Sequence, residues 1–290
     1  MFVKEKIQIN PTAQGYLNGI PLGDYDAMIN FAGGQMVARN PRKHVRLIEG
    51  NMNGAQKRFY LKQAFSMQPL QILKAFLKEG KARMVTEREL ELLRLLEAQG
   101  VPVMHPVAWG SRRLLGVPLS GFLLVEEVQG KRFTDMYEAL DELGRRRLMK
   151  AYGALVGFMH TKGLDSIVRV TDMICVSKDF TDFKRSLVVI DREWGSLRRK
   201  KISFKKRCQQ LGKMFAKMLR WIGLPTDREV ISFTRGYLEE SQDVNYLISQ
   251  VLERSTFYAL KSIKGKAKYD QVRKRLEGVG KESIHGNDAF

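Results

Sequence analysis

Residues 86–101 read TERELELLRLLEAQGV, the clearest helix pattern in the chain. Leucines recur on one face at helical spacing, and Gly100 is a typical stop signal. Thr86 is a candidate N-cap, and Glu89, three residues later, would complete a capping box. The preceding stretch, HVRLIEGNMNGAQKRFYLKQ at 44–63, has two β-rich runs around a Gly/Asn turn and predicts a hairpin.

Outward from this hairpin and helix, short apolar runs of strand length give way to helical stretches. Further helices are expected at 68–80, at 146–162 and over most of 204–265, and further strands within 101–110, 121–128, 173–176 and 186–191. A β-rich part followed by a mostly helical part predicts an α+β fold with a small first lobe and a larger second lobe. The expected boundaries are a loose N-terminal extension at 1–40, a first lobe at 41–128, a second lobe at 129–263 and a basic tail at 264–290.

The composition indicates a folded, strongly basic protein. Its 290 residues are 44% hydrophobic and 28% charged, which is typical of a globular chain with a core. Fifty Lys and Arg against 31 Asp and Glu give a formal net charge of +19. Such a surplus favours a polyanionic partner: nucleic acid, an anionic membrane face or a phosphorylated substrate. Composition alone does not choose among these partners.

Cysteine usage and hydropathy indicate the compartment. The chain has two cysteines, Cys175 and Cys208, which are too few for a disulfide framework and do not have a metal-binding spacing. The N-terminus lacks the apolar core of a signal peptide, and no apolar run reaches the length of a membrane span. A cytoplasmic protein, soluble or peripheral to a membrane, is therefore expected.

Five short signals follow one another in the chain: FYLKQ, ERELELLRLLEAQGV, FLLVEEV, MHTKG and VVIDREWG. In this order they resemble the protein-kinase-like superfamily and, within it, the lipopolysaccharide core heptose kinase and Kdo kinase family. The resemblance covers residues 44–240. It implies a protein-kinase-like fold with two lobes, ATP and Mg as cofactors, and phosphate transfer to a sugar hydroxyl of an anionic glycolipid.

The resemblance also assigns charged residues to the nucleotide. Lys62 closes the strand of FYLKQ and would contact the α- and β-phosphates while paired with Glu89, with Glu87 as the alternative partner. Asp191 follows the apolar run LVVI, where its carboxylate would hold a metal ion that bridges the phosphates. Charged phosphates and metal ions require these residue types at these places.

Backbone groups would complete the nucleotide site. The turn from Gly50 to Gly54 would cover the phosphates with its N–H groups, although a plain hairpin turn explains the same residues. The run FLLVEEV would be the hinge between the lobes, where backbone groups of Glu126 and Val128 would bind the adenine edge. A simple strand between the lobes explains that run equally well.

The catalytic loop departs from the family pattern. After M-H-x-x-G the family has I-N-H-R-D, whose Asp is the base or orients the hydroxyl, and a metal-binding Asn or His follows five residues later. This chain reads GLDSIVRVTDMICV at 163–176. Aligned without gaps, Val168 takes the position of the base and Met173 that of the metal ligand; a shift by one residue places Ile167 and Asp172 there. Neither Val nor Ile accepts a proton.

Two carboxylates are candidates for the missing functions. Asp165 would reach the substrate hydroxyl if the loop differs, and Asp172 would be a second metal ligand beside Asp191. Without either role, the chain would be a pseudokinase that recognises an anionic glycolipid or a partner enzyme. His160 of MHTKG is expected to pack near the loop in a structural role.

A basic stretch at 192–220 includes the runs Arg198–Lys201 and Lys205–Arg207. Lipid A and inner-core sugars are densely anionic, so this stretch would dock such a substrate at the inner face of the membrane. A solvated helix face is the alternative. Nucleic-acid binding is less favoured, because the stretch lacks interleaved aromatic residues and no nucleic-acid motif is recognisable.

Overall fold

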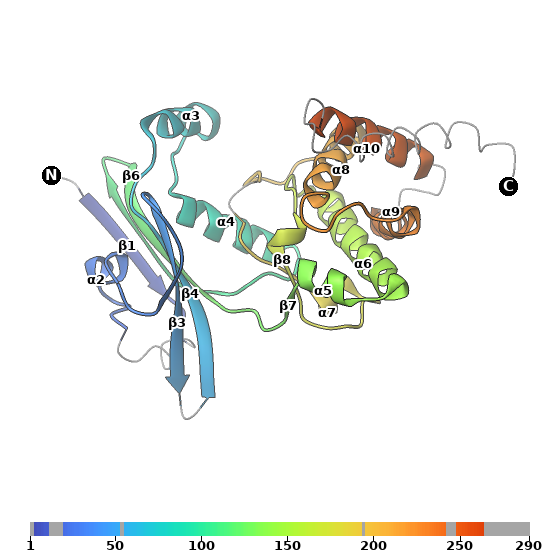
Figure 1. The fold of residues 1–290 in the computed structure, drawn as a ribbon. Coiled ribbons are helices and arrows are strands. Elements are labelled where there is room, and N and C mark those ends of the chain that lie inside the picture. Colours follow the sequence, from blue (N-terminus) through green and yellow to red (C-terminus); the bar gives the residue numbers. More distant parts are fainter. Residues whose placement is uncertain (1–2, 12–19, 53–54, 193–194, 242–247, 264–290) are drawn as a thin grey trace, which may run out of the picture. The chain divides into compact units, whose positions relative to one another are not determined.

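The computed structural model describes residues 3–11, 20–52, 55–192, 195–241 and 248–263. These residues form two compact units, which are described separately (Figure 1). The first unit takes the described residues up to Ala98, Val103–Val128, and Asp191 with Arg192. The second takes Gln99–Pro102, Gln129–Ile190 and the described residues from Gly195 onward.

The first unit is built on a six-stranded antiparallel sheet with the strand order β1-β5-β6-β4-β3-β2. The strands are β1 (Val3–Ile9), β2 (Gln35–Asn40), β3 (Lys43–Met52), β4 (Ala55–Ala64), β5 (Pro106–Leu114) and β6 (Val117–Glu126). The hairpin expected at 44–63 is confirmed as β3 and β4, which pair from Lys43 opposite Ala64 to Met52 opposite Ala55.

The described residues at 3–11 and 20–40 contribute strands and a helix to the first unit, which corrects the expectation of a loose extension there. β1 and β2 are the two edge strands of the sheet, and α2 (Tyr25–Ile29) packs Tyr25 and Met28 into a core with Phe59 and Leu61. Gln63 fastens α2 to β4, because its Nε2 donates to the backbone carbonyls of Met28 and Ile29. Short edge strands between turns have little periodicity, so the sequence pattern did not reveal them.

Helix α4 (Val85–Glu97) confirms the helix expected within 86–101, but its cap differs from the prediction. Met84 is the N-cap, and its N–H donates to Oε2 of Glu87 at 2.9 Å, so the assignment of Thr86 and Glu89 to a capping box was wrong. Glu89 is therefore not engaged at the helix end and lies on the buried face of α4. Helix α3 (Pro69–Glu79), expected at 68–80, is also confirmed.

Helices α2 and α4 lie on opposite faces of the sheet (Figure 1). Side chains alternate between faces along a strand, and residues that pair across two strands share a face. Leu61 packs in the core beside α2, whereas the next residue, Lys62, contacts Glu89 of α4. Gly121 of β6 lets α4 approach closely, because a Cβ there would lie 2.8 Å from the Thr86 hydroxyl. The Lys62–Glu89 pair thus lies on the α4 face of the sheet, opposite the core around α2.

The second unit is mostly helical and confirms the expected larger helical part. Its helices are α5 (Phe133–Ala139), α6 (Glu142–Thr161), the 3-10 helix η2 (Val170–Asp172), α7 (Phe183–Ser186), α8 (Phe204–Met218), α9 (Asp227–Ser241) and α10 (Ile248–Ile263). A small sheet has the order β7-β8-β9, with strands β7 (Lys131–Arg132), β8 (Met173–Cys175) and β9 (Leu187–Val189). Helix α6 begins four residues before the expected start, and residues 264–290 lie outside the described part.

Close helix packing holds the second unit together. Helices α6 and α9 pack along each other, and α8 packs against α10. Gly153 and Gly157 of α6 permit this approach, because a Cβ on either would collide with a backbone carbonyl of α9. Among the described residues, no helix has the length and hydropathy needed to span a membrane.

Candidate functional site

Three charged residues of the first unit form the most distinctive polar cluster. Lys62 of β4 places its Nζ 2.5 Å from Oε1 of Glu89 on α4 and 3.0 Å from Oδ1 of Asp191. The Lys62 and Glu89 side chains are only 7% and 1% exposed, whereas that of Asp191 is 45% exposed. The pairing of Lys62 with Glu89 rather than Glu87 is the one that the sequence favoured, and Glu87 instead pairs with Arg113.

The cluster keeps Lys62 charged. Burial alone would lower the pKa of Lys62, but the adjacent carboxylates of Glu89 and Asp191 outweigh it and raise the pKa above its usual value. A buried ammonium is stable only when such partners compensate its lost hydration. Lys62 is therefore a buried cation held in place by two carboxylates, of which that of Asp191 is exposed to solvent.

Asp191 has an unusual backbone conformation. Its φ of 53° lies in the left-handed region, which a non-glycine residue rarely adopts and which Asp tolerates better than most. Strand β9 ends two residues earlier, at Val189, so this turn of the chain directs the Asp191 carboxylate to Lys62. Strained backbone of this kind is concentrated at functional sites.

The described residues contain no group of three or more His, Cys, Asp or Glu that could hold a metal ion alone. Mg²⁺ is usually bound by one or two carboxylates together with substrate phosphates and water. The half-exposed carboxylate of Asp191 fits that mode, and Glu89 adds a buried Oε2 that has no hydrogen-bond partner. These carboxylate oxygens are of the type that binds a divalent metal together with a phosphate ligand.

The pairing of β3 with β4 determines which turn lies near Lys62, and it is not the turn that the sequence analysis chose. Lys62 pairs with Val45, near the start of β3, whereas Gly50 pairs with Lys57 five residues away. At the usual rise of a strand, Gly50 is therefore about 17 Å from Lys62 along the hairpin. The turn at Gly50 cannot cover a phosphate bound at Lys62, which corrects the prediction; Gly54 lies outside the described residues.

The turn at the Lys62 end joins β2 to β3 and carries basic residues instead of glycines. Oδ1 of Asn40 accepts from the backbone N–H groups of Arg42 and Lys43 at 2.9 Å, which fixes the turn. Lys43 pairs with Ala64, so it shares a face of the sheet with Lys62. Its charge acts on the Glu89 carboxylate. The sequence analysis missed Lys43, although its distance from Lys62 follows from the hairpin register.

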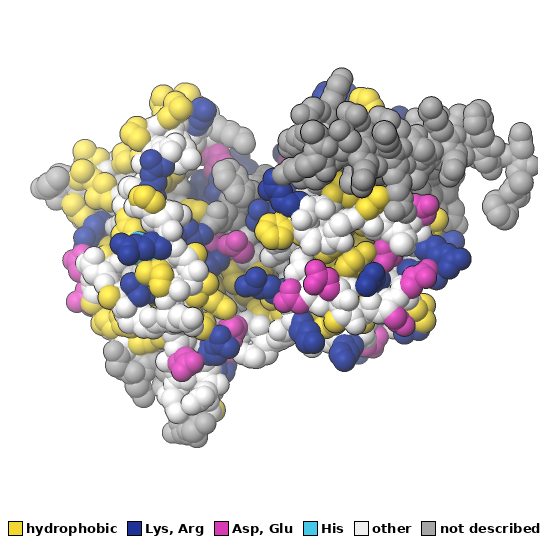
Figure 2. All heavy atoms as spheres, in the orientation of Figure 1, with side chains coloured by type: hydrophobic (Ala, Val, Ile, Leu, Met, Phe, Trp, Pro, Cys, Tyr) yellow, Lys and Arg dark blue, Asp and Glu magenta, His cyan; other side chains and the backbone are white. Residues whose placement is uncertain are grey.

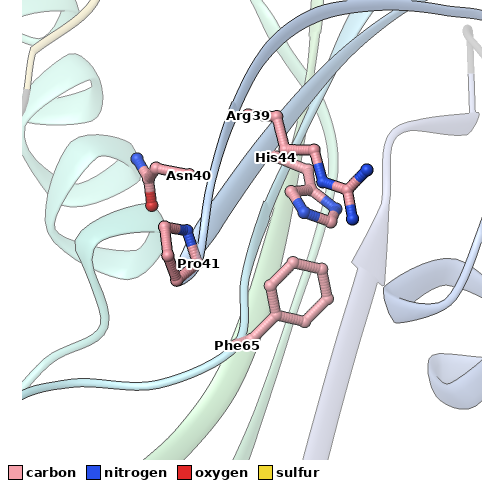
Figure 3. A pocket seen from close by; sticks show the side chains of 5 residues that line it. All are labelled: Arg39, Asn40, Pro41, His44 and Phe65. Atoms are coloured by element: carbon pink, nitrogen blue, oxygen red, sulfur yellow. The ribbon is translucent and has the colours of Figure 1, made fainter.

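A shallow pocket opens beside the same turn, but on the other face of the sheet. Figure 3 shows its lining residues, Arg39, Asn40, Pro41, His44 and Phe65. The rings of His44 and Phe65 meet edge to face, with their centroids 4.7 Å apart. His44 pairs with Gln63, whose side chain points to α2, so this pocket is separate from the Lys62 cluster.

The expected hinge residues lie where the first unit ends. Strand β6 ends at Glu126, whose backbone N–H donates to the His105 carbonyl at 3.0 Å and whose carboxylate pairs with Lys57 at 2.6 Å. The Glu126 N–H is therefore not available to adenine, and only other backbone groups of the run FLLVEEV remain to bind the adenine edge. Val128 is the last residue of the first unit before Gln129 begins the second.

Asp165, in the loop after α6, is held by residues from the basic stretch. Lys200 Nζ lies 2.6 Å from its Oδ2, and the Gln210 amide donates to its Oδ1. Burial pushes the pKa of Asp165 up, but Lys200 outweighs that effect and the pKa falls below its usual value. The carboxylate is therefore ionised and already neutralised locally.

Asp172 is held by a neighbour in sequence. The Arg169 guanidinium lies 2.7 Å from its Oδ1, and the Arg169 N–H and the Thr171 hydroxyl donate to the same carboxylate. These contacts close the short helix η2. The Asp172 carbonyl accepts from the N–H of Ile190, the residue just before Asp191 in the chain.

The position of the missing base is apolar in the structure as well. Val168 is fully buried, and its carbonyl accepts from the Tyr152 hydroxyl at 2.6 Å. Ile167 is partly buried, and Ser166 is buried. The side chains at 166–168 are buried or partly buried and present no carboxylate or imidazole as an acid or base.

The comparison with family models decides the family. The model described as the lipopolysaccharide kinase (Kdo/WaaP) family matches residues 38–237. The chain belongs to the lipopolysaccharide kinase (Kdo/WaaP) family. The resemblance drawn from the five signals is thereby confirmed, and the match begins inside β2, which the sequence analysis had assigned to the extension.

One solved structure supports the fold of this lipopolysaccharide kinase family member. The chain is similar to "WaaP in complex with acyl carrier protein", with a TM-score of 0.59 and 19% identity over 89% of this chain and 100% of that chain. This likeness confirms the protein-kinase-like α+β fold class. The bifunctional kinase-methyltransferase WbdD gives a TM-score of 0.39 and 15% identity, covering 79% of this chain and 47% of that chain. No curated protein matches the sequence.

Within this lipopolysaccharide kinase fold, His160 has a structural environment. Its Nδ1 lies 2.9 Å from the Tyr237 hydroxyl of α9, and the ring is buried. Burial lowers the pKa of His160 to about 4, and the interaction with the Gln210 side chain, which acts in the opposite direction, does not cancel this effect. A neutral, buried ring joined to α9 supports the structural role that the sequence predicted.

This environment predicts a pH-dependent stability. An unfolded His has a pKa of about 6.5, so between there and about pH 4 the unfolded chain binds a proton that native His160 does not. The free energy of unfolding should therefore fall as the pH falls through this window, by about 3 kcal/mol in total. Urea unfolding of the wild type and of His160→Gln at several pH values measures it. The variant should lose this part of the slope, and equal slopes would contradict the assignment.

Some cations of the basic stretch are paired with other residues of the second unit. Lys200 pairs with Asp165, and Arg199 Nε donates to the Lys162 carbonyl at 2.9 Å. Arg198 and Lys201 are exposed. The run Arg198–Lys201 is therefore not a uniform solvated patch, because two of its four cations hold the loop that follows α6.

Proposed function

We propose that this protein is an ATP-dependent sugar kinase that transfers phosphate to a sugar hydroxyl of an anionic glycolipid of the lipopolysaccharide core. The observation that carries the proposal is the contact of Lys62 with both Glu89 and Asp191 inside the first unit. A phosphate-binding Lys held by a helix Glu, beside a metal-binding Asp, is the arrangement that kinases use. Family membership supports the acceptor class.

Each residue of the cluster has a distinct role in this proposal. Lys62 binds the phosphates, and Glu89 fixes the Lys62 ammonium in place. Asp191 would hold the divalent metal ion, taken to be Mg²⁺, which when bound neutralises charge on the phosphates. Phosphoryl transfer depends mainly on such positioning and electrostatics, so a weak or absent base does not by itself exclude activity.

Lys43 supplies a second cation in place of a glycine-rich loop. Because it lies on the same sheet face as Lys62 and acts on Glu89, Lys43→Ala should weaken MgATP binding on the order of 3- to 10-fold. Lys57→Ala is the matched control, since Lys57 lies at the Gly50 end of the same hairpin. Titration calorimetry compares the two. If Lys57→Ala weakened binding as much as Lys43→Ala, the turn at Gly50 would be restored as the phosphate loop.

The acceptor would approach the exposed cations of the second unit. Arg198, Lys201 and Lys205 are exposed and remain suited to phosphorylated sugars. A substrate of this kind places the protein in the cytoplasm, peripheral to the inner membrane. In the described part of the stretch at 192–220, no aromatic side chain is among the exposed large apolar residues, so base stacking is not supported and nucleic acid is a weaker candidate.

A pseudokinase is the second candidate, and a specific observation favours it. Asp165 is paired with Lys200, Asp172 is paired with Arg169, and Val168 is buried at the position of the base. Because both carboxylates are already held in ion pairs, neither is positioned as a free base for the substrate hydroxyl. A pseudokinase would bind the nucleotide or glycolipid and transfer nothing.

Phosphate transfer from labelled ATP to purified core glycolipid separates the two candidates. With the full chain, Mg²⁺ and ATP, the kinase proposal expects labelled glycolipid whose formation requires the metal. Binding of MgATP without any transfer, tested over a set of core glycolipids with different inner-core sugars, would replace the kinase by the pseudokinase. Heat-inactivated protein is the blank.

A further inference from the structure

Helix α3 of the first unit presents an apolar face to solvent. Leu70, Leu73, Phe76 and Leu77 are all exposed, and Leu77 has 79% of its surface accessible. At 3.6 residues per turn, these four side chains fall within an arc of about 120° on one side of the helix. Ile72 and Glu79 project from the other side, where they are partly buried.

The other side of α3 is fixed to the first unit. Glu79 accepts from Arg88 of α4 at 2.8 Å and from Arg83 at 3.2 Å, and Gly80 ends the helix in a left-handed conformation with φ 69°. These ion pairs hold the C-terminal turn of α3 against α4. The apolar face is thus held outward by the packing of its own unit.

The chemistry around this face selects its partner. Lys74 and Lys81 are exposed beside the apolar residues, and the whole chain has a net charge of +19. Figure 2 shows yellow side chains gathered over α3 with dark blue ones next to them. A second copy of the chain would bring like charges together, whereas an anionic lipid surface attracts the lysines and accepts the leucines.

We propose that α3 lies in the interface of an anionic lipid bilayer, with Leu70, Leu73 and Leu77 among the acyl chains and Lys74 at the headgroups. Eleven residues are too few to span a bilayer but suit a helix that lies along its surface. This inference concerns lipid, not the glycolipid acceptor, and it does not depend on nucleotide binding.

Flotation of the full chain with vesicles tests the proposal. Vesicles of phosphatidylethanolamine with phosphatidylglycerol should bind the wild type, and phosphatidylcholine vesicles should bind it less. Leu73→Gln/Leu77→Gln keeps good helix formers in α3 and should weaken binding by about 10-fold or more. Lys74→Glu/Lys81→Glu should weaken binding to the anionic vesicles only.

The matched control is Leu143→Gln/Ile231→Gln. These two exposed apolar residues, with 51% and 39% of their surface accessible, belong to α6 and α9 of the second unit rather than to α3. The control should bind as the wild type does, and thermal unfolding should show all variants folded. Equal binding by the α3 double variant, or no wild-type binding at low salt, would overturn the proposal.

Other occupants of the face give different results. A wild type that is dimeric without lipid and becomes monomeric with Leu73→Gln/Leu77→Gln would assign the face to a second copy. If an acidic helical protein bound to the face while the wild type did not bind the vesicles, the face would be assigned to a protein partner. Loss of vesicle binding in Arg198→Glu/Lys201→Glu alone would move the lipid contact to the second unit. Each of these results overturns the assignment of α3 to lipid.

Discussion

Lys62→Met is expected to abolish the stabilisation of the protein by MgATP. The substitution removes the cation that the phosphates would meet and leaves Glu89 buried without its partner. Breaking a buried ion pair in this way costs about 3–5 kcal/mol, so the variant should also be less stable without nucleotide. For the wild type, nucleotide at 100 times its dissociation constant should contribute about 2.7 kcal/mol, or several degrees in Tm.

The loss of stability must be separated from the loss of binding. Lys62→Met/Glu89→Leu removes both buried charges and should regain folding stability without regaining the nucleotide effect. Asp191→Asn keeps the shape of a half-exposed side chain and should fold normally while losing the metal-dependent part of the shift. Lys57→Ala, on the surface, is the control. If the double variant were stabilised by MgATP as strongly as the wild type, the nucleotide would bind elsewhere.

Asp172→Asn is expected to reduce phosphate transfer by about 10²–10⁴-fold if the protein is the proposed kinase. Asp172 carries the only carboxylate of the loop at 166–173, and its carbonyl is hydrogen-bonded to Ile190, next to Asp191 in sequence. Asp165→Asn should have the smaller effect, because Asp165 is tied to Lys200 and Gln210. The assay is transfer from labelled ATP, with thermal unfolding as the check on folding.

Arg169→Gln separates chemistry from packing in this second test. Asp172 closes η2 through Arg169, so a purely structural Asp172 predicts similar losses of stability and activity in Arg169→Gln and Asp172→Asn. If the Asp172 carboxylate instead acts at the metal, Asp172→Asn should lose nearly all phosphate transfer, whereas Arg169→Gln should not. Wild-type transfer by both Asp165→Asn and Asp172→Asn would show that neither carboxylate takes part in catalysis.

Local patterns in the sequence were sufficient for the hairpin, the helix after it and the Lys62–Glu89 pair. Alternation and the apolar stripe specify which face of each element is buried, and this orients Lys62 toward α4. The capping residues were misassigned because a capping box favours Thr at the N-cap, whereas the N-cap is Met84, two residues before Thr86. A shift of two residues at a helix end is beyond what such a motif resolves.

The phosphate turn could not be located while residues 1–40 were taken for an extension. Once β2 is known to pair with β3, the turn at Asn40–Lys43 is the one beside Lys62, and the glycines at the far end lose their role. Arg169 and Asp172 are three residues apart in the sequence, so their contact could have been predicted from the spacing. The contact of Asp165 with Lys200 joins distant parts of the chain, and no local pattern reports it.

Titration calorimetry of the full wild-type chain with ATP, with and without Mg²⁺, tests the central claim most directly. The Lys62–Glu89–Asp191 cluster predicts saturable binding of one nucleotide per chain that weakens when Mg²⁺ is chelated and disappears in Lys62→Met/Glu89→Leu. Absence of any binding at millimolar MgATP by a folded wild type would contradict the account.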